Sequence, residues 1–338
     1  MRTEIIATVR RIDSQKNFES MISKLIKNNV KYYRFNMRKF DEKNIVDLYA
    51  DLKILQQNAD IKVMLDLPYP GNKLKIKTFH NEEIRIKKNQ ILTIEYSDIE
   101  PAKENYLCIN KQGFSDNLIV GDLLFYADGE GAFEVIKRKY TCSICVKALN
   151  DFSLYPYKSI FTKKIFKEYR IPNYLKDIIK EILPESIALS FVEKPEDIQW
   201  IYDCFLEKNK CPQIISKIET NNGVKNIEKI LTETDGIMIA RGDLGLSIKP
   251  EELYCVQQYI TRKAQQYGKT VMIATDILKS LVSLYLPSRA DIIDCYEILR
   301  QGLDYLVLNC DLLYEGDIDR ICSLIYSMRN SLGKNMMI

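Results

Sequence analysis

Charged residues follow several short apolar runs of this chain, and their types indicate chemistry on an anionic substrate. Lys217 and Glu219 end one such run, and Asp243 lies three residues after the apolar stretch that ends at Ala240. Carboxylate oxygens are the protein ligands that Mg²⁺ and Mn²⁺ prefer, with the remaining positions left to water and substrate. Glu219 and Asp243 are therefore predicted to hold a divalent metal.

Positive charge is expected beside this metal. Lys217 lies two residues before Glu219, so in an extended strand the two side chains point to the same face. Arg34 ends another apolar run and adds a second cation. Together with the metal, these groups would make a site for anionic oxygens. Further candidates at the ends of such runs are Asn36, Asp66, Arg241 and Thr275.

The stretch Ala240–Gly245 runs from an apolar segment into a short helical turn. Its glycines permit close backbone approach, and N–H groups at the start of a helix bind carboxylate or phosphate. An anion is therefore expected near Gly242 and Asp243. Single charges at strand ends are often only solvated, and an arginine beside carboxylates, such as Arg241, is equally well explained by a structural ion pair.

The elements that would position these residues alternate between short β-branched or aromatic runs and helical patterns, which is typical of parallel strands joined by crossover helices. Helical spacing occurs in six of the intervening segments. The eight predicted strands are Glu4–Val9, Lys31–Asn36, Lys62–Leu67, Ser186–Val192, Gln213–Glu219, Gly236–Arg241, Thr270–Asp276 and Tyr305–Cys310. Eight βα repeats predict an α/β fold of the (β/α)₈ TIM-barrel class, in which strand ends carry the active site.

The repeat is interrupted after the third strand. Residues 75–169 contain alternating segments, such as Ile91–Tyr96 and Leu123–Tyr126, that predict a small β-rich domain. We therefore assign residues 1–74 and 170–338 to a catalytic barrel and residues 75–169 to an inserted domain. An insertion in a βα loop lies at the active-site face, where it can act as a lid.

Composition narrows the function classes. The formal net charge is +3 from 49 basic and 46 acidic residues, and no basic stripe interleaved with aromatics is present, so nucleic acid is not expected as a partner. Nine scattered cysteines indicate buried thiols in a reducing compartment, and no long apolar run predicts a membrane span or a signal peptide. A cytoplasmic location is expected. His80 is the single histidine, which argues against a Ser-His-Asp triad.

Several motifs, in their order and spacing, resemble the pyruvate kinase family. The resemblance extends over nearly the whole chain, and its central block is the most specific part. The matching segments are Tyr33–Asn36, Leu65–Asp66, Asp128–Gly129, Ala188–Val192, Ile214–Val224, Asp235–Gly245, Ala274–Thr275 and Pro287–Ala290.

The resemblance implies a phosphotransferase of glycolysis that moves phosphate from phosphoenolpyruvate to ADP, giving pyruvate and ATP, with Mg²⁺ or Mn²⁺ as cofactor. Lys217 would stabilise the phosphoryl group in transfer, and Arg34 would contact the phosphate. Thr275 would lie beside the enolpyruvate, and N–H groups around Gly242 would hold its carboxylate. Asn36 and Asp66 complete the implied substrate site, and Glu219 and Asp243 the metal site.

This chain also departs from the family pattern. After Asn36 the family has Phe-Ser-His-Gly, in which the serine is a potassium ligand and the histidine lies near the nucleotide; Arg38 and Lys39 stand there instead. Leu67 replaces a threonine that also binds this cation. We therefore expect no potassium requirement, and Lys39 and Lys73 become the nucleotide-binding candidates. The sequence also stops before the family's C-terminal regulatory domain, so a monomer or small homo-oligomer is expected.

The proton-donor side of the pocket differs too, since Asn309–Leu312 replaces Ser-Gly-Glu-Thr. Two alternatives therefore stay open beside the phosphotransferase. One is a metal-dependent lyase or another enolate-forming enzyme acting on a 2-oxo acid, which needs no nucleotide. The other is a non-catalytic relative that binds phosphoenolpyruvate.

Overall fold

The computed structural model describes residues 3–40, 45–57, 60–68, 74–77, 83–97, 105–109, 112–140, 143–155, 158–162, 173–205 and 211–334. The chain divides into two compact units, residues 1–69 with 171–338, and residues 70–170. The strand that begins at Leu74 pairs within the second unit, so this residue belongs there and not with the barrel segment that the sequence assigns to residues 1–74.

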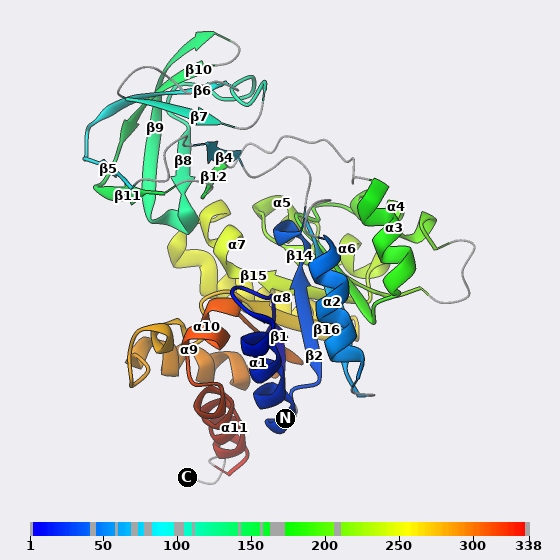
Figure 1. Ribbon diagram of the computed structural model, residues 1–338. Coiled ribbons are helices and arrows are strands. Elements are labelled where there is room, and N and C mark those ends of the chain that lie inside the picture. Colours follow the sequence, from blue (N-terminus) through cyan, green and yellow to red (C-terminus); the bar gives the residue numbers. More distant parts are fainter. Residues whose placement is uncertain are drawn as a thin grey trace. The chain divides into compact units, whose positions relative to one another are not determined.

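The first unit is a closed barrel of eight parallel strands, which confirms the predicted fold class (Figure 1). Neighbouring strands pair in the order β1-β17-β16-β15-β14-β13-β3-β2, and the pairing of β1 with both β17 and β2 closes the ring. The strands are β1 (Glu4–Thr8), β2 (Tyr32–Asn36), β3 (Lys62–Leu67), β13 (Ser186–Leu189), β14 (Gln213–Ile218), β15 (Gly236–Ala240), β16 (Thr270–Ala274) and β17 (Tyr305–Leu308).

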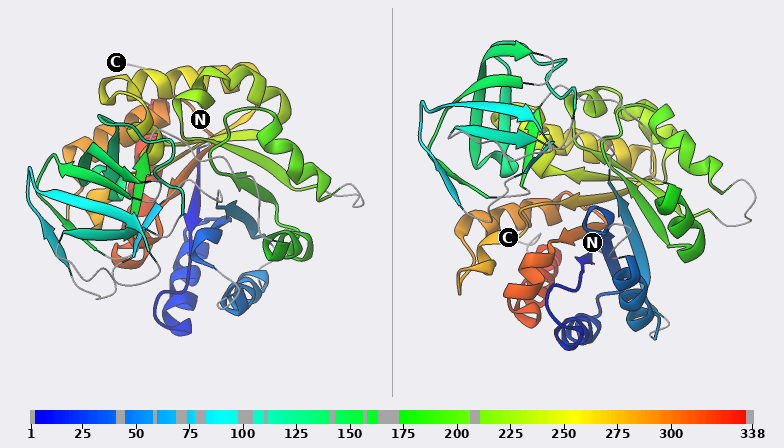
Figure 2. Two further views of the ribbon diagram at one scale, coloured as in Figure 1. Left: turned by 90° about the horizontal axis from the view of Figure 1, so that it is seen from above. Right: turned by 45° about the horizontal axis from the view of Figure 1, so that its top comes forward.

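Helices lie around the outside of these strands in both views of Figure 2. Their buried faces, such as Phe18 and Leu25 of α1, pack with outward-facing strand residues such as Tyr33 and Phe35 into one large apolar cluster. The helices are α1 (Gln15–Lys27), α2 (Ile45–Gln56), α3 (Asn173–Ile182), α4 (Glu196–Asp203), α5 (Asn221–Lys225), α6 (Ile227–Glu233), α7 (Arg241–Ser247), α8 (Leu253–Gln266), α9 (Arg289–Arg300), α10 (Cys310–Glu315) and α11 (Ile318–Lys334).

A separate apolar cluster fills the inside of the barrel. It contains one or two inward-facing residues from seven of the eight strands: Ile6, Met64, Ala188, Ile215, Met238, Met272, Ala274 and Val307. Because side chains alternate between the two faces of a strand, the residue two positions after each of these also points inward, but nearer the C-terminal end of the barrel. Polar side chains at those positions are therefore brought together at the C-terminal end of the barrel.

The second unit is a closed barrel of seven strands in the order β10-β6-β7-β4-β12-β8-β9, with a separate two-stranded sheet β11-β5. Its core includes Leu92, Phe133 and Val146, all of which are buried. The strands are β4 (Leu74–Lys77), β5 (Ile84–Ile86), β6 (Ile91–Tyr96), β7 (Tyr106–Ile109), β8 (Leu123–Tyr126), β9 (Gly131–Tyr140), β10 (Ser143–Ala148), β11 (Phe152–Leu154) and β12 (Ser159–Thr162).

Six of the eight barrel strands end one to three residues before the predicted position, for example β16 at Ala274 instead of Asp276 and β17 at Leu308 instead of Cys310. The fourth barrel strand ends at Leu189 instead of Val192, because Phe191 adopts a left-handed conformation with φ of 56° and turns the chain away from the sheet. The expectation that the cysteines are buried is wrong for Cys211 and Cys255, which are exposed. Within the part of the chain that the structure describes, no helix is long and apolar enough to cross a membrane.

Candidate active site

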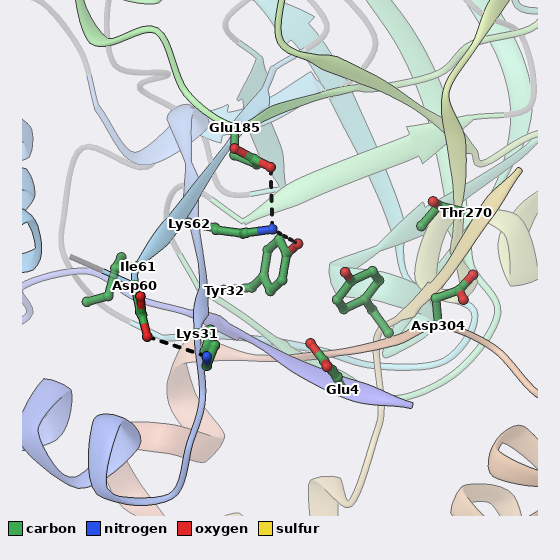
Figure 3. A pocket seen from close by; sticks show the side chains of 10 residues that line it. Glu4, Lys31, Tyr32, Asp60, Ile61, Lys62, Glu185, Thr270 and Asp304 are labelled. Carbon is green, nitrogen blue, oxygen red and sulfur yellow. Dashed lines mark hydrogen bonds and ion pairs between the residues drawn. The ribbon is translucent and has the colours of Figure 1, made fainter. Parts of the chain in front are cut away.

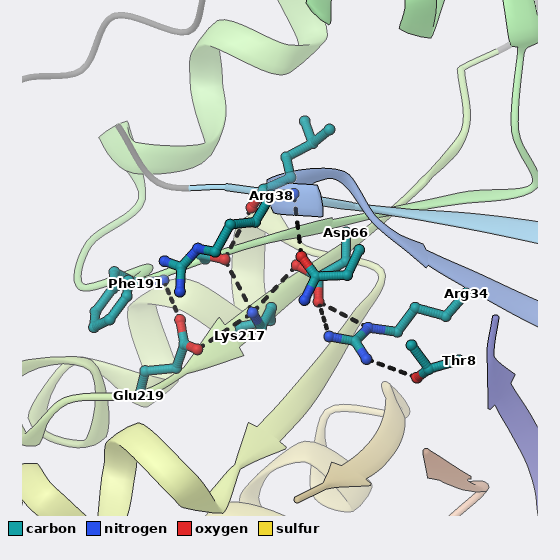
Figure 4. A network of polar contacts seen from close by, with 10 residues as sticks. Thr8, Arg34, Arg38, Asp66, Phe191, Lys217 and Glu219 are labelled. Atoms are coloured by element: carbon teal, nitrogen blue, oxygen red, sulfur yellow. Dashed lines mark hydrogen bonds and ion pairs between the residues drawn. The ribbon is translucent and has the colours of Figure 1, made fainter. Parts of the chain in front are cut away.

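Three side chains from three strands meet at the C-terminal end of the eight-stranded barrel (Figure 4). Asp66 of β3 lies two residues after Met64, and Lys217 of β14 lies two residues after Ile215, so both point inward above the apolar cluster. Arg34 of β2 donates to Asp66 Oδ2 from Nε at 2.8 Å and from Nη2 at 2.6 Å. Lys217 Nζ lies 3.2 Å from Asp66 Oδ1. Asp66 therefore joins both cations.

Lys217 makes two further contacts. Its Nζ donates to Ser190 Oγ at 2.9 Å and lies 3.2 Å from Glu219 Oε1. Ser190 Oγ in turn donates to the carbonyl oxygen of Leu67 at 2.9 Å. Only 10% of the Lys217 side chain is exposed, and the carboxylates of Asp66 and Glu219 are 3% exposed. The ammonium group is thus fixed by partners on several sides.

The charges in this cluster stabilise one another in ionised form. Burial alone would lower the pKa of Lys217, but Asp66 and Glu219 outweigh it and raise that pKa above its ordinary value, with a smaller contribution from Asp243. Burial would likewise raise the pKa of Asp66, but Lys217 and Arg34 outweigh it and hold that pKa below its usual range. At neutral pH the two cations and the carboxylate between them are charged.

Glu219 is oriented by the backbone. Its Oε2 accepts a hydrogen bond of 2.6 Å from the N–H of Phe191, and its Oε1 faces Lys217. The left-handed turn at Phe191 directs this N–H toward the carboxylate, so the early end of β13 has a consequence for the site. The residue as a whole is 2% exposed.

A divalent cation would fit the charge balance of the cluster. Asp243, in the first turn of α7, is 8% exposed and close enough to raise the pKa of Lys217. Asp66, Glu219 and Asp243 bring three negative charges against the two positive charges of Arg34 and Lys217. Hard oxygen ligands and one excess negative charge suit Mg²⁺ or Mn²⁺. Among the described residues no three His, Cys, Asp or Glu side chains form a metal-binding group.

Asn36 and the residues after it occupy the end of β2. The Oδ1 atom of Asn36 accepts from the N–H of Arg38 at 3.2 Å and caps a 3₁₀ turn over Met37–Lys39. Arg38 is half-buried, and Figure 4 shows its guanidinium on the side of the network where Phe191 and Glu219 lie. Lys39 is exposed. Lys73, the other nucleotide-binding candidate, lies outside the described residues.

Thr275 directly follows β16 and has φ of 80°, a conformation that is rare for a β-branched residue. Such left-handed residues cost on the order of 1–3 kcal/mol each and persist only where the surroundings hold them. A Cβ at Gly242 would lie 3.1 Å from Thr275 Cγ2, so the threonine side chain rests against the backbone at the start of α7. The structure therefore brings Thr275 next to Gly242, as the sequence suggested for the substrate end of the site.

Arg241 is not paired with the site carboxylates. Its Nη1 donates to Asp294 Oδ1 of α9 at 2.6 Å, and its Nε and Nη2 donate to the carbonyl oxygen of Thr275 at 3.2 and 2.8 Å. Arg241 therefore forms an ion pair with Asp294, and not with the site carboxylates that the sequence placed beside it.

Three groups of the network are absent from the sequence-based candidates: Thr8, Ser190 and the N–H of Phe191. Thr8 Oγ1 accepts from Arg34 Nη1 at 2.7 Å. Thr8 lies two residues after Ile6, and Ser190 two after Ala188, so the alternation rule applied to every strand would have found both. The role of Phe191 depends on a backbone turn, for which its sequence carries no signal.

A pocket of about 730 Å³ lies at the opposite, N-terminal end of the barrel (Figure 3). First residues of strands line it, including Glu4, Tyr32 and Lys62. Lys62 Nζ donates to the Tyr32 hydroxyl at 2.9 Å and lies 3.5 Å from Glu185. The polar groups that line this pocket thus bind one another. Active sites of enzymes with this fold lie at the C-terminal end of the strands, opposite to this pocket.

Comparison with known proteins shows the family of this chain. The sequence matches the family described as pyruvate kinase, barrel domain, over residues 1–312. It is 29% identical to a pyruvate kinase of Thermoplasma acidophilum over 91% of this chain and 54% of the relative. It is 30% identical to a pyruvate kinase of Thermotoga maritima over 91% of this chain and 66% of the relative.

A solved structure, a pyruvate kinase from Cryptosporidium parvum, is similar with a TM-score of 0.81 and 26% sequence identity, covering 98% of this chain and 69% of that one. The chain thus spans 54% and 66% of the length of the two sequence relatives. Because the family match extends over most of the chain and agrees with the observed barrel, this chain belongs to the pyruvate kinase family.

Proposed function

We propose that this protein transfers a phosphoryl group between phosphoenolpyruvate and ADP. The observation that carries the proposal is the buried network in which Asp66 joins Arg34 and Lys217 beside Glu219. Phosphoryl transfer needs little covalent chemistry from a protein, and its catalysis consists mainly of positioning and charge stabilisation. A preorganised pair of cations that is shielded from water supplies both.

In this proposal the ammonium group of Lys217 lies against the transferring phosphoryl group and offsets its negative charge. Arg34 binds a phosphate oxygen, while Asp66 holds both cations in place. Glu219 and Asp243 would hold a divalent cation, which when bound would supply further positive charge to the anionic substrate. Thr275 and the N–H groups at Gly242 and Asp243 would face the enolpyruvate and its carboxylate.

The balanced reaction converts phosphoenolpyruvate, ADP and a proton into pyruvate and ATP. The bond between the enol oxygen and phosphorus breaks, a bond from an ADP oxygen to phosphorus forms, and the enolate carbon takes up the proton. The groups proposed for the enolpyruvate lie in the segments that directly follow β15 and β16, whereas Lys39, proposed for the nucleotide, is exposed. We further propose that potassium is not required, because Arg38 supplies positive charge beside the site.

The test is a coupled assay of pyruvate formed from phosphoenolpyruvate by the full chain. It is run with Mg²⁺ or Mn²⁺, with and without ADP, and with and without potassium. Pyruvate formation that needs ADP and metal, and that Lys217→Ala abolishes, supports the proposal. Arg300→Gln, which changes an exposed ion pair of α9, is the control and should keep the wild-type rate.

The alternatives give other outcomes. Metal-dependent binding of pyruvate by calorimetry, with no pyruvate formed from phosphoenolpyruvate whether or not ADP is present, would favour an enolate-forming enzyme that works without nucleotide. Binding of phosphoenolpyruvate without turnover would identify a non-catalytic relative. Either result overturns the phosphotransferase.

A further inference from the structure

Arg241 makes three hydrogen bonds that join three separate elements. It is the first residue of α7, and only 10% of its side chain is exposed. Nη1 donates to Asp294 Oδ1 on α9 at 2.6 Å. Nε and Nη2 both donate to the carbonyl oxygen of Thr275, which follows β16. A planar guanidinium presents its donors from separate edges of a rigid fork and can therefore bridge partners that lie apart, whereas all the donors of a lysine come from one nitrogen atom.

The carbonyl that Arg241 binds belongs to an unusual piece of backbone. Thr275 and Asp276 have φ of 80° and 57°, two consecutive left-handed residues with no glycine. Regular pairing of β16 with both neighbours ends one residue earlier, at Ala274. Strand pairing in the barrel therefore does not fix the conformation of Thr275. The hydrogen bonds from Arg241 to the Thr275 carbonyl oxygen are positioned to fix it.

The side chain of Thr275 contacts the backbone of Gly242. A Cβ at Gly242 would lie 3.1 Å from Thr275 Cγ2 and 3.6 Å from Oγ1, so the threonine side chain touches this backbone. Arg241 and Gly242 are adjacent in sequence and contact the backbone and the side chain of the same residue. Thr275 thus contacts the segment that carries Asp243 through both its backbone and its side chain.

We propose that Arg241, which is paired with Asp294, is a positioning residue that keeps Thr275 left-handed and thereby fixes its side chain against Gly242. This inference rests on the proposed function for its effect on turnover, because Thr275 is the residue that would touch the enolpyruvate. Arg241 itself acts through Thr275 and does not contact the reacting atoms.

The experiment is a double-mutant cycle of Arg241→Gln and Thr275→Ala in the full chain. Misplacing a catalytic group by about 1 Å costs about 10²-fold in rate, so Arg241→Gln should lower kcat by that order with a smaller change in KM. In the Thr275→Ala background the same change should cost less than about 3-fold, because residues in contact are not additive. Arg241→Lys should not rescue kcat, and Asp294→Asn should lower it about 10-fold or less, since only the ion pair is lost.

A matched control distinguishes the loss of Thr275 positioning from a general loss of protein stability. Arg300→Gln removes a guanidinium from an ion pair on the same helix as Asp294 and should leave kcat unchanged. All rates are compared at a temperature well below each variant's Tm. If Arg241→Gln and Thr275→Ala multiply in their effects, or if Arg241→Gln changes only Tm, the positioning role is wrong.

A second readout does not depend on turnover. The crystal structure of Arg241→Gln should show Thr275 with a negative φ or with its side chain moved away from Gly242. If φ stays near 80°, Arg241 does not hold Thr275, whatever the enzyme assay gives. If wild-type protein lacks turnover but this φ changes, the phosphotransferase proposal fails while the positioning inference stands.

Discussion

Both hydrogen bonds from Arg34 to Asp66 end on the same carboxylate oxygen, Oδ2, at 2.8 and 2.6 Å. The other oxygen, Oδ1, is left to face Lys217 at 3.2 Å. One carboxylate therefore holds two cations on separate oxygens, although their mutual repulsion would otherwise push them apart. Arg34 correspondingly lowers the pKa of Lys217, while Asp66 raises it more strongly.

The first prediction concerns Asp66→Asn and alkaline pH. Burial lowers the pKa of Lys217, and Asp66 is the largest opposing influence, so its loss should lower that pKa. A lysine whose pKa is higher in the folded than in the unfolded protein stabilises the fold. This stabilisation is fully present below the unfolded-state pKa of about 10.4, and it is lost as the pH rises through the folded-state pKa. The alkaline limbs of kcat against pH and of Tm against pH should both move to lower pH in the variant.

The matched control for this prediction is Glu297→Gln, which removes a half-buried carboxylate that is paired with Arg300 far from Lys217 in the sequence. It should leave both alkaline limbs unchanged. If Asp66→Asn also leaves them in place, Lys217 is not the group that Asp66 keeps charged.

The second prediction is that Lys217→Ala loses turnover but keeps measurable binding of phosphoenolpyruvate. The ammonium group is proposed to act on charge that develops during transfer, and removing one such preorganised group costs about 10²–10³-fold or more in kcat. The variant should also unfold more easily, by about 3 kcal/mol, because Asp66 and Glu219 lose a buried partner. Turnover, calorimetric binding and chemical denaturation measure the three effects. A rate near that of wild type would remove Lys217 from the mechanism.

Much of the barrel could be predicted because its strands carry a strong local pattern. Strand existence follows from runs such as Ile214–Ile218, and inward polar residues follow from the two-residue alternation. The predicted residues Arg34, Asp66, Lys217 and Glu219 lie in one network. Their metal and substrate roles stay predictions.

What the sequence missed depends on backbone geometry and on distant partners. The turn that directs the Phe191 N–H toward Glu219 needs a positive φ at a phenylalanine, a conformation that the phenylalanine side chain does not favour. Arg241 pairs with Asp294, which lies 53 residues away on a helix. The apolar pattern of that helix predicts which face is buried, but not which residues its polar side chains contact. Such contacts are fixed by tertiary packing and leave no periodic trace in the sequence.

The third prediction concerns Ser190, which the sequence did not single out. Its hydroxyl accepts from Lys217 and donates to the carbonyl of Leu67, both at 2.9 Å. Ser190→Ala should cost about 1 kcal/mol of unfolding free energy, the ordinary contribution of a hydrogen bond. Because Lys217 gains freedom to move, kcat should fall about 10-fold with a smaller change in KM.

The control for Ser190 is Ser23→Ala, whose hydroxyl also donates to a backbone carbonyl but on the exposed face of α1. It should change neither kcat nor Tm appreciably. If the two variants behave alike in the turnover assay, the hydrogen bond from Lys217 to Ser190 has no part in the reaction.

The fourth prediction concerns Arg38 and monovalent cations. Asp66, Glu219 and Asp243 exceed the charges of Arg34 and Lys217 by one, so a further cation nearby lowers the electrostatic cost of binding an anion. We expect wild-type turnover to be the same in potassium and in tetramethylammonium salts of equal ionic strength. Arg38→Ser should lower turnover about 10-fold in tetramethylammonium, and added potassium should restore part of it, because a bound cation can replace the lost charge.

Lys53→Ser is the control for this charge change. Lys53 is exposed on α2, and its loss alters the net charge of the protein by the same amount as Arg38→Ser. A potassium response in Lys53→Ser would indicate a general effect of net charge, and activation of the wild-type protein by potassium would show that Arg38 does not replace the monovalent cation. A response confined to Arg38→Ser instead places the substitute charge at the end of β2, where Asn36 caps the turn that carries Arg38.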